Sequence, residues 1–111
     1  MRKDKENDIV INKTLDIFKE CIPVFSVLSD ENRQKIIIEI AVNDMLNVGQ
    51  IAKRIPLSRP AISHHLKNLK NAGLVAVEKK GTENYYYLTL KESVERLKTL
   101  IFQIEESCYL K

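Results

Sequence analysis

Between Ser58 and Lys70 a set of polar and cationic side chains recurs at helical spacing, and no carboxylate occurs from Ser58 to Ala76. An arginine fork can bond both major-groove acceptors of guanine, while hydroxyl and imidazole groups can bond bases or phosphates. A helix face of this kind suits the anionic groove of DNA. The members of the face are Arg59, Pro60, Ser63, His64, Lys67 and Lys70.

The helix that would carry this face has recognisable ends. Ser58 can accept a bond from a first-turn amide, Pro60 suits a helix start, and Gly73 can supply a left-handed stop. Just before it, residues 48–55 favour a short helix, and Pro56 and Leu57 make a tight turn. Two helices joined in this way predict a helix-turn-helix. The apolar stripe on the inner side of the second helix is Ile62, Leu66 and Leu69.

Two β-rich runs follow this second helix. Residues 74–80 and 85–90 flank a Gly-containing loop of about four residues, 81–84, which predicts a hairpin. Strand alternation turns Tyr86 and Leu88 inward and Tyr85 and Tyr87 outward. A helix-turn-helix followed at once by a hairpin with a basic tip is a winged helix.

At this point the sequence resembles the ArsR/SmtB family of bacterial and archaeal repressors, over roughly residues 24–90. The resemblance rests on linked motifs, namely LSDENR at 28–33, LSRPAISHHL at 57–66, LKNAGLV at 69–75, and Gly81 followed by Tyr85 and Tyr86. It supports a mainly α-helical winged helix-turn-helix with a small β-hairpin, in the order α-α-α-α-β-β-α. It also implies a homodimer that binds double-stranded DNA and represses transcription.

The length and the charge distribution agree with one DNA-binding domain, 1–111. We divide it into an N-terminal dimerisation region, 1–28, a DNA-binding core with its wing, 29–90, and a C-terminal dimerisation helix, 91–111. The whole formal excess of +3 lies in residues 58–90, which carry five cations against two anions. Confinement of the excess to one segment favours an electrostatic footprint for phosphates. With no apolar run near the ~18 residues of a membrane span and no signal peptide, we expect a cytoplasmic protein.

The two terminal segments carry apolar seams. Residues 8–28 have two adjacent stripes, one beginning at Val10 and one at Ile11, which implies burial against the chain's own core and against a second chain. Pro23 predicts a break or kink and a new short helix starting there. Residues 91–111 repeat apolar positions at steps of three and four, as two packed helices do. We therefore expect a two-fold homodimer. Its expected interface residues are Val10, Ile17, Cys21, Val94, Leu97, Ile101, Ile104 and Cys108.

Between these segments, Asp30 to Arg33 begin a further helix, capped by Ser29 or Asp30. Arg33 belongs to a structural signature of the resembling family, and we interpret it as a fold-stabilising or backbone-contacting residue. His65 is expected to be packed, because adjacent histidines on a helix diverge.

A two-fold dimer places two recognition helices about 34 Å apart, so the expected target is an inverted repeat read in successive major grooves. The resemblance places Arg59, Pro60, Ser63 and His64 at base edges and Lys67 near the backbone. In the wing, Lys79 and Lys80 would reach phosphates. The expected DNA-binding residues are Ser58, Arg59, Pro60, Ser63, His64, Lys67, Lys79, Lys80, Thr82 and Asn84.

Other functions find little support. No catalytic Cys–His or Ser–His spacing, carboxylate pair or phosphate loop predicts an enzyme. Metal-sensing members of the family carry thiolates where this chain has Asn47 and Gly49, and no His follows Lys91, so we expect no metal and no cofactor. Two alternatives stay open: a thiol switch through Cys21 and Cys108, which otherwise serve as packing residues, and a winged helix that binds proteins without an operator.

Overall fold

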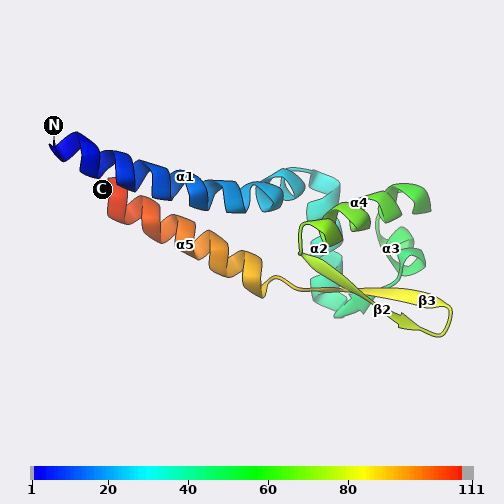
Figure 1. Cartoon of the computed structure of the whole chain (residues 1–111). Helices are drawn as coiled ribbons and strands as arrows, with labels where there is room; N and C mark the ends of the chain where they lie inside the picture. The colour runs from blue at the N-terminus through cyan, green and yellow to red at the C-terminus, as the bar shows by residue number, and fades with distance from the viewer. Residues whose placement is uncertain (1, 109–111) are drawn as a thin grey trace. The chain divides into compact units, whose positions relative to one another are not determined.

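The computed structural model describes residues 2–108 and shows a mainly helical chain with a small antiparallel sheet (Figure 1). The elements are α1 (Arg2–Leu28), α2 (Glu31–Asn43), β1 (Met45–Leu46), α3 (Val48–Arg54), α4 (Arg59–Asn71), β2 (Val75–Lys80), β3 (Glu83–Leu88) and α5 (Lys91–Cys108). This is a winged helix-turn-helix, as predicted. The chain forms two compact units, one containing α5 and α1 as far as Pro23, the other residues 24–90.

The unit of residues 24–90 packs α2, α3 and α4 with the sheet. Each helix begins with a side chain that satisfies a free backbone amide. Asp30 Oδ1 accepts from the amide of Arg33 at 3.1 Å, and Asn47 and Gln50 form a reciprocal capping box at the start of α3. These caps orient apolar residues toward one core, made of Ile36, Ile40, Leu46, Ile51, Ile55, Ile62, Leu66, Leu69, Leu74 and Val75.

The sheet has the order β1-β3-β2, and β1 was not predicted. This strand has two residues, Met45 and Leu46, which pair with Tyr87 and Tyr86 of β3. A segment this short shows no periodicity, and its extended conformation depends on hydrogen bonds to a strand about 40 residues later in the chain.

The hairpin turn is also shorter than the expected loop 81–84. Lys80 pairs directly with Glu83, so only Gly81 and Thr82 lie between the strands. Gly81 has a φ of 64°, and a two-residue hairpin turn with glycine first favours this conformation. Asn84, expected at the tip, therefore belongs to β3.

In the other unit, α1 and α5 run side by side (Figure 1). The expectation of a new helix at Pro23 was wrong, because α1 continues through it to Leu28. Pro23 removes the amide that would bond the carbonyl of Lys19, and Lys19 is exposed, so water can replace that donor.

The helix pair buries the middle of one of the two stripes of α1, at Cys21. Cys21 is a free cysteine that is completely buried, and its Sγ donates to the carbonyl of Arg96 on α5 at 3.7 Å. Of the same stripe, Ile17 is half-buried and Val10 is 37% exposed. On α5, Leu100 is buried and Leu97 and Ile104 are half-buried. Cys21, expected at the interface with a second chain, is thus already buried within one chain.

The second stripe of α1 is exposed. Ile11 is 53% and Ile22 54% exposed, and on α5 Ile101 and Phe102 are exposed to 57% and 62%. Cys108 ends α5, but its side chain lies outside the described part of the structure.

Among the described residues, no helix combines the length and the apolar character that crossing a bilayer requires.

Candidate nucleic-acid interface

The start of α4 is built as its sequence predicts. Ser58 Oγ accepts a hydrogen bond from the amide of Ala61 at 3.2 Å. Pro60 lies in the first turn, where the N–H that proline lacks would have no helical acceptor. At the other end, Gly73 adopts a φ of 80°, and the amide of Leu74 bonds the carbonyl of Leu69 at 2.9 Å. The inner stripe, Ile62, Leu66 and Leu69, is completely buried.

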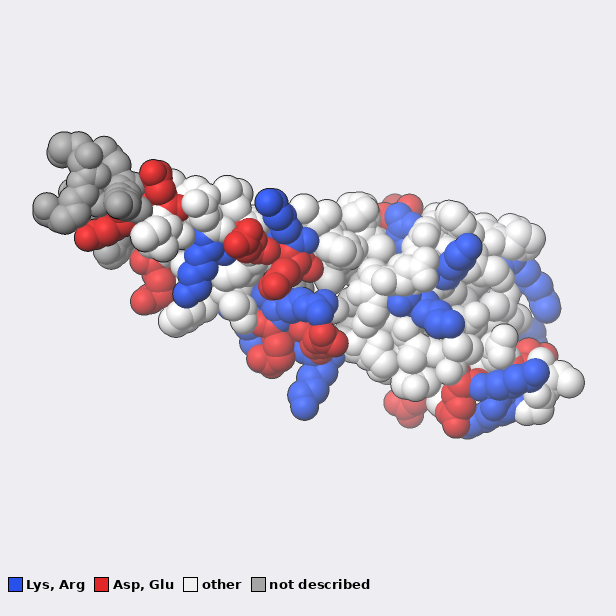
Figure 2. Space-filling model, in the orientation of Figure 1, with Lys and Arg blue, Asp and Glu red and all other residues white. Residues whose placement is uncertain are grey.

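Burial of that stripe turns the polar face of α4 to solvent. Every member predicted from the sequence is exposed: Arg59, Pro60, Ser63, His64, Lys67 and Lys70. In the view of Figure 2, the unit of residues 24–90 carries scattered blue side chains on a white background with a few red ones at its edges. The wing tip carries blue and red side chains together. The helix α4 thus presents hydroxyl, imidazole and cationic groups without a carboxylate of its own.

His64 contacts Asn68, a residue that was not predicted to lie beside it. Its Nε2 lies 3.3 Å from Nδ2 of Asn68, one helical turn later on the same face. This contact orients the imidazole and favours the tautomer whose Nε2 accepts the amide hydrogen. The spacing of four residues between His64 and Asn68 was the signal that could have indicated it.

His65 lies on a different side of α4. It is half-buried, its Nδ1 is completely buried without a hydrogen-bond partner among the described residues, and its ring is tilted by 56° from that of His64. The prediction of a packed histidine is confirmed, and the exposed face holds one imidazole only.

Arg33 joins the start of α2 to the end of α1. Its Nε donates to the carbonyl of Val27 at 2.9 Å, and its Nη2 lies 3.8 Å from Oδ2 of Asp30. The amide of Arg33, more than any other group, holds the pKa of Asp30 below its ordinary value; burial opposes this, and the charges of Arg33 and His65 reinforce it. With only 17% of its side chain exposed, Arg33 has the structural role that we predicted as one of two.

The register of the wing separates its two lysines. Lys79 pairs with Asn84, on the sheet face that also carries Tyr86 and the buried Leu46. Side chains alternate along a strand, so Lys80 and its partner Glu83 lie on the opposite face. Lys79 therefore lies on the face of the sheet that packs on the helices, and Lys80 on the outer face.

Lys80 is also held by its neighbours. Its Nζ lies 5.8 Å from the centre of the Tyr85 ring and 3.4 Å from Sδ of Met45. The ring face and the thioether both attract the ammonium group. Lys79 and Asn84 are both exposed, as is Thr82 in the turn.

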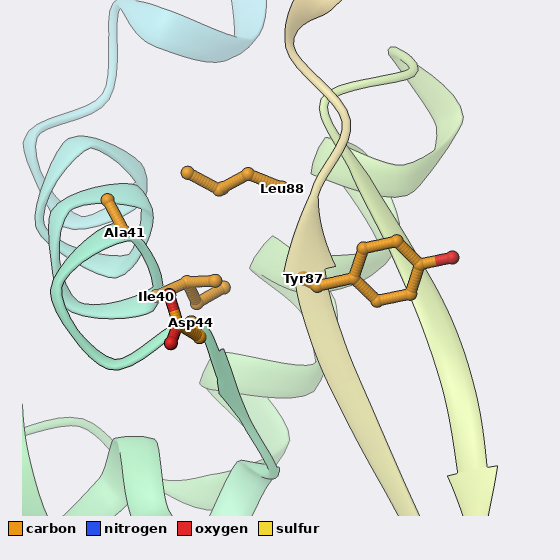
Figure 3. A pocket seen from close by; sticks show the side chains of 5 residues that line it. All are labelled: Ile40, Ala41, Asp44, Tyr87 and Leu88. Atoms are coloured by element: carbon orange, nitrogen blue, oxygen red, sulfur yellow. The ribbon is translucent and has the colours of Figure 1, made fainter.

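A separate open hollow of about 350 Å³ lies between the end of α2 and β3, lined by Ile40, Ala41, Asp44, Tyr87 and Leu88 (Figure 3). Leu88 and Tyr87 point to opposite sides of β3, as alternation requires. None of the predicted DNA-binding residues lines this hollow.

Comparison with known proteins gives consistent results. Residues 30–77 match a family described as "Bacterial regulatory protein, arsR family". An uncharacterized HTH-type transcriptional regulator of Methanocaldococcus jannaschii is 32% identical over 92 residues, which are 83% of this chain and 99% of that protein. The transcriptional repressor SdpR of Bacillus subtilis is 42% identical over 65 residues, or 59% of this chain and 71% of SdpR.

A solved structure resembles this one over most of both chains. An ArsR-like transcriptional regulator from Rhodococcus sp. RHA1 superimposes with a TM-score of 0.75 and 34% sequence identity, covering 83% of this chain and 84% of that one.

Proposed function

The chain belongs to the arsR family of bacterial regulatory proteins, and from this premise we propose that it represses transcription as a homodimer bound to an inverted-repeat operator. Like its relatives, it is a DNA-binding transcriptional regulator, and it is not an enzyme. A dimer that covers a promoter blocks polymerase without further parts.

The observation that carries this proposal is the exposed face of α4. A buried stripe fixes the rotation of the helix, so its cations and hydroxyls are presented together, without a carboxylate from the helix itself. Lys79 and Asn84 lie in the same compact unit, on the helix side of the wing. A wing of this kind can follow the phosphate backbone while the helix enters the major groove.

The proposed roles follow from the chemistry of each group. Arg59 makes the main specific contact, because its fork can bond guanine O6 and N7 together. Ser63 and His64 bond bases or phosphates, Pro60 makes apolar contact, and Ser58 and Lys67 lie near the backbone. In the wing, Lys79 and Lys80 bind phosphates with Thr82 and Asn84 beside them.

The proposed dimer uses the exposed apolar stripes of the terminal helices. One chain alone leaves Ile11, Leu15 and Ile22 of α1 and Ile101 of α5 largely exposed. Burial of such surface against a copy of itself would stabilise a two-fold pair. Of the interface predicted from the sequence, Val94 and Ile101 are exposed, while Leu97 and Ile104 are half-buried in one chain.

Selection of bound duplexes from a random library tests the proposal. We expect an enriched two-fold symmetric motif whose half-sites are about one helical turn apart. Mobility shifts on that duplex, on a single half-site and on a scrambled duplex, each across a salt series, then separate specific from electrostatic binding. A selection without enrichment and with equal retention of all three duplexes would contradict the operator and favour a winged helix that binds proteins.

A further inference from the structure

The structure shows a close approach between Gly49, in the first turn of α3, and Arg59, the first residue of α4. A methyl group added at Gly49 would lie 3.3 Å from Nη2 and 3.6 Å from Cζ of Arg59. Asn47 Oδ1 borders the same space at 3.5 Å. The guanidinium group therefore lies against the backbone of α3, in space that is open because residue 49 has no side chain.

Neither residue is favoured by its own helix. Glycine is a poorer helix former than alanine, and Gly49 does not have the positive φ that would require it. Arg59 places a cation at the N-terminus of α4, where the helix dipole favours an anion. When two residues depart from local preference at the same point of contact, a functional constraint is the expected reason.

We propose that Gly49 is a positioning residue for the recognition of DNA bases. Because it has no side chain, it leaves a space beside Asn47, here called the seat, in which the guanidinium of Arg59 is ordered before DNA binds. This inference rests on the proposed role of Arg59 at a base edge. A long, exposed arginine loses rotamer freedom when it binds, and a side chain that is already ordered loses less. The seat therefore favours the specific complex and leaves sequence-independent phosphate contacts unchanged.

The test compares Gly49→Ala in the natural chain and in an Arg59→Ala background. The readout is the ratio of affinities for the selected operator and for a scrambled duplex, at one salt concentration. In the natural chain the guanidinium must shift by a few tenths of an ångström to admit the added methyl. We expect the ratio to fall by roughly 3- to 10-fold, a typical coupling between residues in contact. In the Arg59→Ala background, Gly49→Ala should leave the ratio unchanged.

Thermal unfolding without DNA gives a second readout. Alanine has a higher helix propensity than glycine, so Gly49→Ala should raise Tm in the Arg59→Ala background. It should raise Tm less in the natural chain, where the methyl meets the guanidinium. Lys53→Ala is the matched control, because it alters an exposed residue of the same helix and should lower both affinities alike.

The outcomes separate this inference from the proposed function. If Arg59→Ala lowers the ratio and Gly49→Ala does not, or if Gly49→Ala raises it, the seat is overturned while the role of Arg59 stands. If Arg59→Ala leaves the ratio unchanged, the role of Arg59 and the positioning role of Gly49 both fail.

Discussion

Nζ of Lys80 lies 5.8 Å from the centre of the Tyr85 ring, on the face of the wing opposite to that of Lys79. The two lysines are adjacent in sequence and have the same charge, yet their surroundings differ. Lys80 pairs across the hairpin with Glu83, and Lys79 with the neutral Asn84. A carboxylate nearby offsets the attraction of Lys80 for a phosphate.

We predict that Lys79→Ala weakens DNA binding more than Lys80→Ala. Loss of one phosphate contact per protomer should reduce the log–log salt slope by about 1 per half-site for Lys79→Ala, and by clearly less for Lys80→Ala. Titrations of operator and scrambled duplex at several salt concentrations give both slopes. Equal slopes for the two variants would show that strand register does not distinguish the lysines.

Arg59→Ala should relax sequence preference. Loss of a bidentate contact to guanine costs roughly 1–3 kcal/mol of discrimination at one base position. Competition between the operator and duplexes substituted at single positions measures this loss. Lys67→Ala is the comparison, because removal of a backbone contact should weaken all duplexes alike. Equal loss on operator and random DNA after Arg59→Ala would refute its assignment to a base edge.

Arg33→Ala should destabilise the fold. The variant loses the bond from Nε to the carbonyl of Val27 and the charge opposite Asp30, and a hydrogen bond from a charged group contributes about 1.5–3 kcal/mol. Chemical denaturation measures the free energy of unfolding. Lys35→Ala, which breaks an exposed pair with Glu31, should change it by about 0.5 kcal/mol or less. Similar losses for the two variants would contradict a structural role for Arg33.

The Asp30 carboxylate predicts a dependence of stability on acid pH. Its pKa is lowered from 3.8, chiefly because the amide of Arg33 donates to the carboxylate in the folded chain. The folded state therefore binds this proton less readily than the unfolded state, so the contribution to stability is complete above the unfolded pKa. It is lost as the pH falls through the folded pKa.

The matching variant is Asp30→Asn, which keeps an oxygen to cap α2 but has no charge to titrate. We expect the natural chain to be the more stable of the two near neutral pH, and the difference to shrink below about pH 4. Unfolding curves across that range check this. A difference that stays constant through the acid range would mean that the charge of Asp30 does not contribute.

The exposed stripe of the terminal helices predicts a site where a charge prevents dimer formation. Ile101 is 57% exposed in a single chain, so Ile101→Glu should leave the chain folded while placing an unpaired carboxylate in the proposed interface. We expect the dimer dissociation constant, measured by sedimentation, to rise by about 10-fold or more. Thr99→Glu, on the other side of α5, should leave it unchanged. Equal effects of both variants would exclude this stripe.

Features that depend on neighbours in the sequence could be predicted from the sequence alone. The extent of α4 follows from Ser58, Pro60 and Gly73, and its rotation follows from an apolar stripe at helical spacing. These signals are local because helix hydrogen bonds and caps join residues about four apart. They were enough to predict the exposed polar face of α4, the hairpin and the family.

Tertiary structure decided what depends on distant partners. Strand β1 exists because β3 pairs with it, and the hairpin register places Lys79 and Lys80 on opposite faces. Packing of α5 selected the stripe of α1 that contains Cys21 and left the other stripe exposed. The seat of Arg59 over Gly49 joins two helices. Such contacts form between segments whose spacing along the chain carries no periodic signal, and only the packed fold brings them together.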